Sequence, residues 1–190
     1  MRQPLLGGTR LVGGTALALQ FGHRRSVDLD FFGHTTEDAE ELTSMFKGCV
    51  GHVVQGTCSP RIKAYVLDGV KVDIVNYGYE WIDEAVVEGE IRMASPKDIA
   101  AMKVNAVVGR GTKKDFIDVY FLLNHYTFDE IMQFYMAKYP ENSEYRALLS
   151  MTYFEDADPQ PMPYMFENVT WESVKNRIKT EVERYNADHL

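Results

Sequence analysis

The spacing of hydrophobic residues in the first half of the chain predicts short strands joined by turns. Val70, Val72 and Ile74 alternate with Lys71, Asp73 and Val75, a period of two that is typical of a strand. Asp68-Gly69 lies just before it and is a strong hairpin signal. Further strands are predicted over residues 11–12, 49–55 and 61–67. A short helical run is expected over residues 16–19, and a helix capped by Thr35 or Thr36 is expected to begin at Glu37.

The second half has apolar residues three and four apart, which predicts helices. The predicted ranges are 95–108, 114–124, 127–139, 143–153 and 170–185, and the proline-containing stretch 156–163 is expected to be a loop. The Tyr and Met residues between Phe128 and Phe166 favour core and lid packing over a nucleic-acid stacking surface. The predicted class is α+β. A small mixed or antiparallel sheet flanked by helices occupies residues 1–92, and a helical region, 93–190, packs against it and completes a cleft.

The stretch from Leu11 to Phe32 carries the candidate chemistry. A short strand leads into Gly13-Gly14-Thr15 and a helix, and paired glycines at a helix start let phosphate approach backbone N–H groups. Asp28 and Asp30 follow on a predicted second strand, where they share one face. Two carboxylates on one face can hold divalent cations, so the stretch is a candidate site for a metal-bound nucleoside triphosphate.

Asp73 is a third candidate carboxylate. Asp is depleted in strands and costly to bury unpaired, so its place in a β-branched strand is unusual. An edge strand with Asp73 in solvent would explain it without function. The functional alternative, which we favour, places it beside Asp28 and Asp30 as a third metal ligand. Oxygen-only ligands suit Mg²⁺ or Mn²⁺.

These motifs, in this order, resemble the nucleotidyltransferase signature of the DNA polymerase β-like superfamily. The strings GGTALAL, GHRRS and DLDFF, with KVNAVVGRGTKKDFIDVYFLL further on, resemble the AbiEii/AbiGii toxin-like nucleotidyltransferases. The resemblance implies that Lys103 and Asp115 contribute to the active site, with Asp118 nearby. Lys103 would neutralise the triphosphate or pyrophosphate, and Asp115 would orient Lys103 or contact the sugar. A charge that stabilises the start of a helix is the structural alternative for Asp115.

The basic turn His23-Arg24-Arg25 precedes the predicted metal strand. These residues could bind phosphate or RNA, with Arg25 as a nucleotide ligand, or could brace the turn through salt bridges. The sequence does not decide between these roles.

The net charge of −8 argues against a protein that coats nucleic acid with a broad basic surface. It leaves one small patch as a docking surface for RNA: Arg24, Arg25, Arg110, Lys113 and Lys114. Cys49 and Cys58 lack zinc-ligand spacing and are expected to be free thiols. No apolar run is long enough for a membrane span, and Gly7, Gly8 and Arg10 interrupt any signal-peptide core, so we expect a cytoplasmic protein.

The function expected from the resemblance is transfer of a nucleotide from an NTP to an acceptor such as tRNA, by the toxin of a toxin–antitoxin or phage-defence pair with an antitoxin partner. One alternative is an enzyme that nucleotidylates a small molecule such as an antibiotic, because an acidic cleft would suit a cationic acceptor. The other is a nucleotide-binding module that has lost catalysis, although the intact carboxylates and Lys103 argue against decay.

Overall fold

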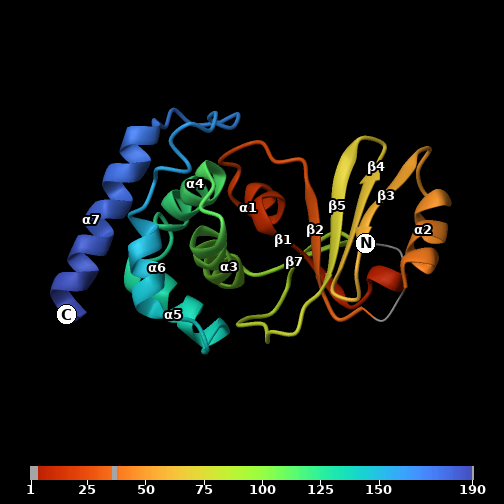
Figure 1. Cartoon of the computed structure of the whole chain (residues 1–190), viewed down its shortest axis with the longest axis horizontal. Helices are drawn as coiled ribbons and strands as arrows, with labels where there is room; N and C mark the ends of the chain where they lie inside the picture. The colour runs from red at the N-terminus through yellow and green to blue at the C-terminus, as the bar shows by residue number, and fades with distance from the viewer. Residues whose placement is uncertain (1–3, 36–37, 190) are drawn as a thin grey trace.

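The computed structural model describes residues 4–35 and 38–189 and contains a seven-stranded mixed sheet with helices packed around it (Figure 1). The strands are β1 (Thr9–Val12), β2 (Leu29–Gly33), β3 (Val53–Cys58), β4 (Ile62–Leu67), β5 (Val70–Asn76), β6 (Val86–Glu88) and β7 (Ile91–Met93). Their spatial order is β3-β4-β5-β2-β1-β7-β6. The pairs β2–β5 and β1–β7 are parallel, and the others are antiparallel. The predicted α+β class is confirmed.

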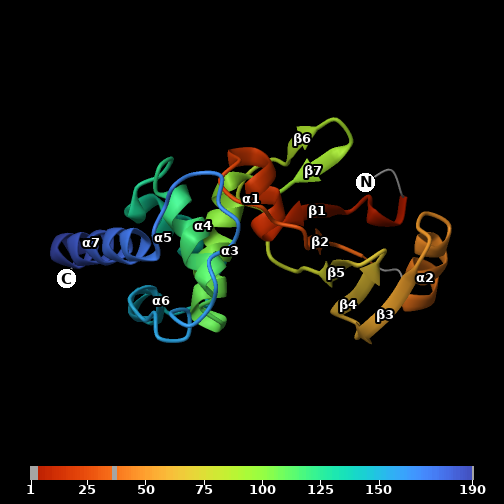
Figure 2. The ribbon, with the colours of Figure 1, turned by 90° about the horizontal axis from the view of Figure 1, so that it is seen from above.

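The helices are α1 (Gly13–Phe21), α2 (Ala39–Lys47), α3 (Pro96–Gly109), α4 (Lys113–Leu122), α5 (Phe128–Lys138), α6 (Glu144–Met151) and α7 (Trp171–His189), preceded by a 3-10 turn, η1 (Pro4–Leu6). Helix α2 lies beside β3 at one end of the molecule, and α3 to α7 gather at the other end (Figure 1). The β6–β7 hairpin and the β3–β4 hairpin lie at opposite edges of the sheet (Figure 2). Among the described residues, no helix combines the length and apolarity that a membrane crossing requires.

Several predicted boundaries shift for local reasons. Strand β3 starts at Val53 rather than at residue 49, because Cys49 and Val50 donate their N–H groups to Phe46 and so close the end of α2. The chain is still extended at Gly56, where a turn was predicted. The cap of α2 is Asp38, whose carboxylate accepts from the N–H groups of Glu40 and Glu41. The predicted capping residue Thr36 and the predicted start, Glu37, lie outside the described residues.

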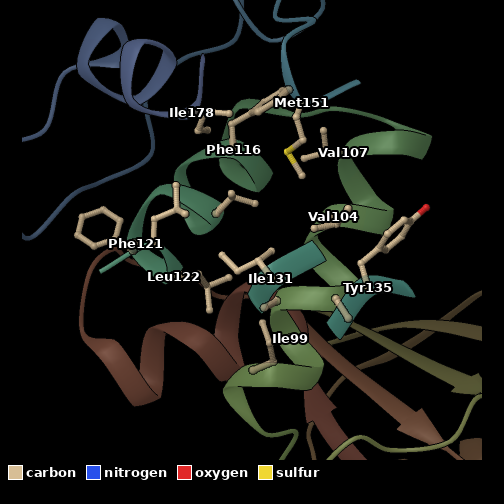
Figure 3. Close-up of a cluster of buried hydrophobic side chains, with 14 of the residues drawn as sticks. Ile99, Val104, Val107, Phe116, Phe121, Leu122, Ile131, Tyr135, Met151 and Ile178 are labelled. Atoms are coloured by element: carbon tan, nitrogen blue, oxygen red, sulfur yellow. The ribbon is translucent and has the colours of Figure 1, made fainter. Parts of the chain in front are cut away.

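Two apolar clusters hold the fold together. The larger one joins α3 to α7 with β1, β7 and α1, and its centre contains side chains such as Ile99, Phe116 and Ile131 (Figure 3). The smaller one lies between α2 and the sheet and includes Leu42, Phe46 and Tyr65. Because Ala16 and Leu17 of α1 belong to the larger cluster, packing continues across residue 92. The division into 1–92 and 93–190 stays a prediction.

Helix α4 is buried on almost every side, and its buried positions include Asp115 and Asp118. Ionised carboxylates are rarely buried unless they are paired. Their partners include Lys103 on α3 and the loop between α1 and β2, which contains His23 and Arg24. These contacts connect α4 to the candidate site.

Candidate active site

Asp30 and Asp73 are direct neighbours on two adjacent parallel strands. In the β2–β5 pair, Asp30 is in register with Asp73, and Phe32 with Val75. Adjacent strands lie about 4.8 Å apart, and residues in register point to the same face of the sheet. The opposite face carries Phe31 and Ile74 toward the smaller apolar cluster. Two carboxylates are therefore held side by side on the face that is turned away from α2.

These two carboxylates are only partly compensated by positive charge. Burial, and then the negative charge of Asp73, raises the pKa of Asp30, against the opposing charges of Lys103, Lys71 and Arg110. Asp73 makes one ion pair through Oδ2, 2.6 Å from Nζ of Lys71. Its Oδ1 is buried and has no hydrogen-bond partner among the described residues. The site thus presents a repelling pair and one unused carboxylate oxygen.

Gly13 brings the start of α1 against this pair. Its φ of +69° lies in the left-handed region, which L side chains rarely adopt. A Cβ built at this position would lie 2.8 Å from Oδ2 of Asp30. No side chain caps the N-terminus of α1, so its first N–H groups keep the anion-binding potential of a free helix end. Gly13 therefore allows an uncapped helix N-terminus and a carboxylate to lie in contact.

A cavity of about 450 Å³ opens beside Gly13 and Asp30. One wall is aromatic, from Phe32, Tyr77, Tyr79 and Tyr139. Further lining comes from strands β1, β4 and β5, from Arg61 just before β4, and from α3 and the Arg110 that follows it, with Met102, Lys103, Asn105 and Ala106 on the helix. Met102 and Ala106 of α3 line the cavity, while Val104 and Val107 of the same helix are buried in the core. This hollow joins carboxylates, cations and aromatic rings, as a nucleotide site requires.

The aromatic wall is fastened to the helical region by polar contacts. The hydroxyls of Tyr77 and Tyr139 lie 2.7 Å apart, and burial raises the pKa of Tyr139 to about 12. Behind them, Nζ of Lys138 bonds Oδ1 of the equally buried Asp98 at 2.7 Å. The same ammonium lies 4.7 Å from the ring centroid of Trp81. These contacts fix the segment after β5 in place as one side of the cavity.

Asp118 is the centre of a buried network below the cavity. Its Oδ1 accepts from Nε2 of His23 at 2.8 Å and from Nε of Arg24 at 2.7 Å. Its Oδ2 accepts from Nη2 of Arg24 at 2.8 Å and lies 2.6 Å from Nζ of Lys103. Burial alone would raise the pKa of Asp118, but Lys103, Arg24 and His23 hold it far below its usual range.

Asp115 joins this network to the cavity wall. Nζ of Lys103 lies 2.9 Å from its Oδ1, and Nε of Arg110 lies 2.9 Å from its Oδ2. The hydroxyl of Thr112 donates to the same Oδ2 at 2.7 Å. These partners outweigh burial and keep the pKa of Asp115 well below normal. Lys103 is 5 % exposed and Arg110 is 65 % exposed, so of these two partners of Asp115 only Arg110 is open to solvent.

Arg24 and Gly14 fit each other closely. A Cβ on Gly14 would lie 2.1 Å from Nη2 of Arg24, which is held in place by Asp118. The neighbouring Thr15 hydroxyl contacts Ser26 Oγ at 2.9 Å and the carbonyl oxygen of Asp28. Thus the Thr15 side chain joins α1 to the segment before β2. Phosphate contacts from this turn would come from its backbone N–H groups.

Asp28 differs in position from Asp30. It precedes β2 rather than lying within it, and it lines a second cavity together with Arg25. Among residues 4–35 and 38–189, no group of three His, Cys, Asp or Glu side chains is placed to hold a metal ion. The structure therefore brings Asp30 and Asp73 together, while Asp28 lies two residues before Asp30 in the sequence. The role of Asp28 as a metal ligand stays a prediction.

The basic turn contains two kinds of residue. His23 and Arg24 are buried and brace the turn against Asp118, whereas Arg25 is exposed. The sequence interpretation missed Asp118 as the centre of the network, although a carboxylate inside the apolar run of α4 was a usable signal. It also missed the aromatic wall, because no local pattern links Phe32 to Tyr77 and Tyr139.

The donor set fits a divalent cation. The unpartnered Oδ1 of Asp73 and the raised pKa of Asp30 both indicate carboxylates that lack positive charge. Hard oxygen ligands beside an anion-binding helix start suit Mg²⁺ or Mn²⁺. Asp30 and Asp73, with Asp28 adjacent, are the residues that would hold it.

Paired carboxylates on a mixed sheet, beside a glycine turn and a helix N-terminus, match the nucleotidyltransferase arrangement that the sequence resembles. Comparison with known proteins agrees: the family model described as nucleotidyl transferase AbiEii toxin, type IV toxin–antitoxin system, matches residues 2–188. The chain belongs to this AbiEii nucleotidyltransferase toxin family, and the family resemblance inferred from the sequence is confirmed.

Individual proteins are similar to the chain over most of its length. A protein of Aquifex aeolicus (strain VF5), itself uncharacterised, is 32 % identical over 183 residues, which cover 92 % of this chain and 86 % of the relative. Two solved structures share the fold. JHP933 of Helicobacter pylori has a TM-score of 0.59 at 16 % identity, covering 93 % of this chain and 83 % of JHP933. The nucleotidyltransferase toxin MenT4 of Mycobacterium tuberculosis has a TM-score of 0.54 at 13 % identity, covering 93 % and 75 %.

Proposed function

We propose that this protein is a metal-dependent nucleotidyltransferase that moves an NMP from an NTP to an acceptor oxygen, with tRNA as the acceptor. The observation that carries the proposal is the register of Asp30 with Asp73 on parallel strands beside the uncapped start of α1. Family membership supports nucleotidyl transfer as the reaction. The acceptor and the metal are the parts that need direct measurement.

The carboxylates Asp30 and Asp73, joined by Asp28, would hold Mg²⁺ or Mn²⁺. When bound, the cation supplies charge neutralisation at the triphosphate. Without it, the negative pair would repel an anionic substrate, since Lys71 is the one cation paired with Asp73 among the described residues. NTP binding is therefore expected to depend on divalent cation.

The protein's own groups would hold the triphosphate in position. The backbone N–H groups of Gly13 and Gly14, at the free end of α1, face the place where phosphate would lie. The guanidinium of Arg110 is open to the cavity and fixed by Asp115, so it can contact phosphate oxygens or the departing pyrophosphate. Lys103 adds positive charge from the cavity floor while Asp115 and Asp118 orient it.

The aromatic wall is a suitable place for the base and sugar. Phe32, Tyr77, Tyr79 and Tyr139 line the cavity. Stacking on these rings tolerates any base, which is consistent with a site whose preference depends on a few polar groups such as Asn105.

Toxin–antitoxin membership of the family supports a partner antitoxin that restrains this activity. A short neighbouring gene with a helix-turn-helix pattern would be the expected source. The net charge of −8 keeps a cationic small molecule as the second candidate acceptor.

The test is an assay with each labelled NTP, Mg²⁺ or Mn²⁺, and either bulk tRNA or cationic small molecules. Label should reach tRNA with the wild type. Asp30→Asn and Asp73→Asn should each reduce transfer at least about a thousandfold, equivalent to roughly 4 kcal/mol in the transition state. Asp188→Asn removes an exposed carboxylate at the end of α7 and should leave transfer unchanged.

The outcomes separate the alternatives. Label found on the small molecule and not on tRNA would identify the small molecule as the acceptor. Absence of transfer to every acceptor, together with absence of cation-dependent NTP binding, would refute the catalytic proposal and favour a binding module.

A further inference from the structure

A second cavity, of about 570 Å³, lies on the other side of the segment that leads into β2. Arg24 to Asp28 form one side, Lys114 of α4 another, and Gln160 to Tyr164 the third. The segment between α6 and α7 runs alongside α4 and the loop that follows α1 (Figures 1 and 2). It is fixed there because Arg25 N–H donates to the Tyr164 carbonyl at 2.8 Å, and Phe166 N–H to the His23 carbonyl at 3.1 Å. Backbone hydrogen bonds therefore hold two sides of this cavity together.

The linings of the two cavities come from neighbouring positions of the chain near the proposed reaction centre. Asp30 lines the first cavity, and Asp28, two residues earlier, lines the second. Gly13 borders the first cavity, while Arg24, which lies against Gly14, borders the second. A ligand in the second cavity would therefore lie near the proposed metal ligands, as an acceptor must.

The second cavity offers cations that the protein itself leaves unpaired. Arg25 and Lys114 are exposed, and neither forms an ion pair with any residue in the described part of the chain. Other members of the predicted basic patch are occupied. Arg24 and Arg110 pair with Asp118 and Asp115, while Lys113 is buried and bonds the Asp158 carbonyl at 3.2 Å. In a chain of net charge −8, two free cations at one cavity mark an anion-binding place.

Exposed rings and apolar side chains lie next to these cations. Tyr164 is 68 % exposed and Phe166 is 61 % exposed, and their ring centroids are 5.6 Å apart. Val27 and Met162 are also exposed there. Tyr164 and Phe166 thus depart from the core and lid packing expected of this stretch. Rings beside free cations are the combination that binds single-stranded nucleic acid by stacking and phosphate contact.

We propose that the second cavity binds a single-stranded segment of the RNA acceptor, with phosphates at Arg25 and Lys114 and a base on Tyr164. This inference rests on the proposed nucleotidyl transfer, because it places the acceptor beside Asp28, one of the proposed metal ligands. A duplex fits less well, since the chain has no broad basic surface to follow two backbones. A single strand needs only the few contacts present here.

The test measures binding without turnover. Wild-type protein without NTP is titrated into a fluorescein-labelled single-stranded RNA of roughly ten nucleotides, with a duplex of equal length as a second probe. Arg25→Glu combined with Lys114→Glu should raise the Kd for the single strand at least about tenfold and flatten its salt dependence. Lys47→Glu, a single charge reversal at the exposed end of α2 and half the charge change of the double variant, should have little effect.

Tyr164 supplies a second readout that charge alone would not affect. Tyr164→Ala should weaken binding of the single strand by roughly five- to a hundredfold, whereas Tyr164→Phe keeps the ring and should bind normally. NTP binding, measured without RNA, should be unchanged in Tyr164→Ala and Tyr164→Phe, and circular dichroism checks the folding of every variant.

Normal RNA affinity in the Arg25/Lys114 double variant would overturn the inference, as would a loss no larger than that of Lys47→Glu. The inference would also be overturned if the Arg25/Lys114 double variant bound RNA normally and lost only its binding to a partner protein. The outcomes also distinguish the two proposals. If transfer to RNA persists while the double variant binds RNA normally, only this inference fails. If RNA binding depends on these residues but NTP is never transferred, the proposed function fails.

Discussion

Two pairs of aspartates, both close to Lys103, differ in their electrostatic surroundings. Asp30 and Asp73 lie on the sheet with one direct ion pair, to Lys71, and the pKa of Asp30 is raised. Asp115 and Asp118 lie three residues apart on α4, surrounded by Lys103, Arg24, Arg110 and His23, and their pKa values are lowered. The first pair lacks positive charge and the second has it in excess.

This difference separates a ligand site from a structural network. Carboxylates that repel each other around an unused oxygen gain most from an added cation, because it relieves both the repulsion and the missing contact. Carboxylates that are already bonded to three or more donors have no capacity left for a ligand. Their role is to fix Lys103 and Arg110, and to hold the turn before β2 against α4. Residue type alone would not distinguish the two pairs.

The largest expected effect comes from removing the centre of the buried network. Asp118→Ala leaves Arg24 and Lys103 without one of their carboxylates in a buried place, so it should lower the free energy of unfolding by about 3–5 kcal/mol. Denaturant unfolding measures this loss. Asp73→Ala is the comparison, since it removes a partly exposed carboxylate that repels Asp30, and stability should change little. Equal losses in the two variants would contradict the distinction.

The local parts of this arrangement could be predicted from the sequence, and the long-range parts could not. Asp73 was identified because an aspartate in a β-branched strand is unusual, and Asp68-Gly69 gives the expected turn, with φ of 47° and 84°. Lys103 and Asp115 followed from the family resemblance, and the structure places them 2.9 Å apart. The helices predicted over 95–108 and 127–139 are also confirmed, and Ser95 and Thr127 cap their N-termini.

The role of Arg24 could not be predicted in the same way. Its partner Asp118 lies 94 residues further along the chain, and no local pattern encodes a contact over that separation. The aromatic wall is similar, because Tyr77 and Tyr139 meet only when α5 packs against the segment after β5. The shift of β3 has a smaller cause: the end of α2 consumed two residues that resembled a strand.

A smaller effect is expected at Gly14, where the buried network contacts the phosphate-binding turn. Gly14→Ala places a methyl group against the Arg24 guanidinium, which cannot move without breaking its bonds to Asp118. The expected cost is about 1–3 kcal/mol in unfolding free energy, measured by denaturant titration. Gly69→Ala is a poor control because its φ is positive, but Gly109→Ala adds a methyl where no atom lies within 4 Å and should be neutral. A neutral Gly14→Ala would show that Arg24 is free to move.

The smallest effect is the response of the two pairs to pH, which should have opposite signs. The lowered pKa values of Asp115 and Asp118 mean that their contribution to stability is present above the ordinary value of 3.8 and is lost as the pH falls below it. The raised pKa of Asp30 means that the folded state holds its proton longer, so stability declines as the pH rises from 3.8 through the folded value.

Asp30→Asn should abolish that decline and leave the metal-free protein slightly more stable than the wild type at neutral pH. Unfolding free energies measured across the acidic range, in chelator, test this directly. Adding Mg²⁺ should then reverse the order, because the cation stabilises the wild type by binding its folded state and has a weaker site in the variant. If the variant follows the wild-type pH curve, the sheet pair is already compensated and the contrast with α4 disappears. If the curves diverge as expected, the Asp30–Asp73 pair lowers the stability of the metal-free protein in a site that binds a cation. Such a loss of stability is typical of functional sites.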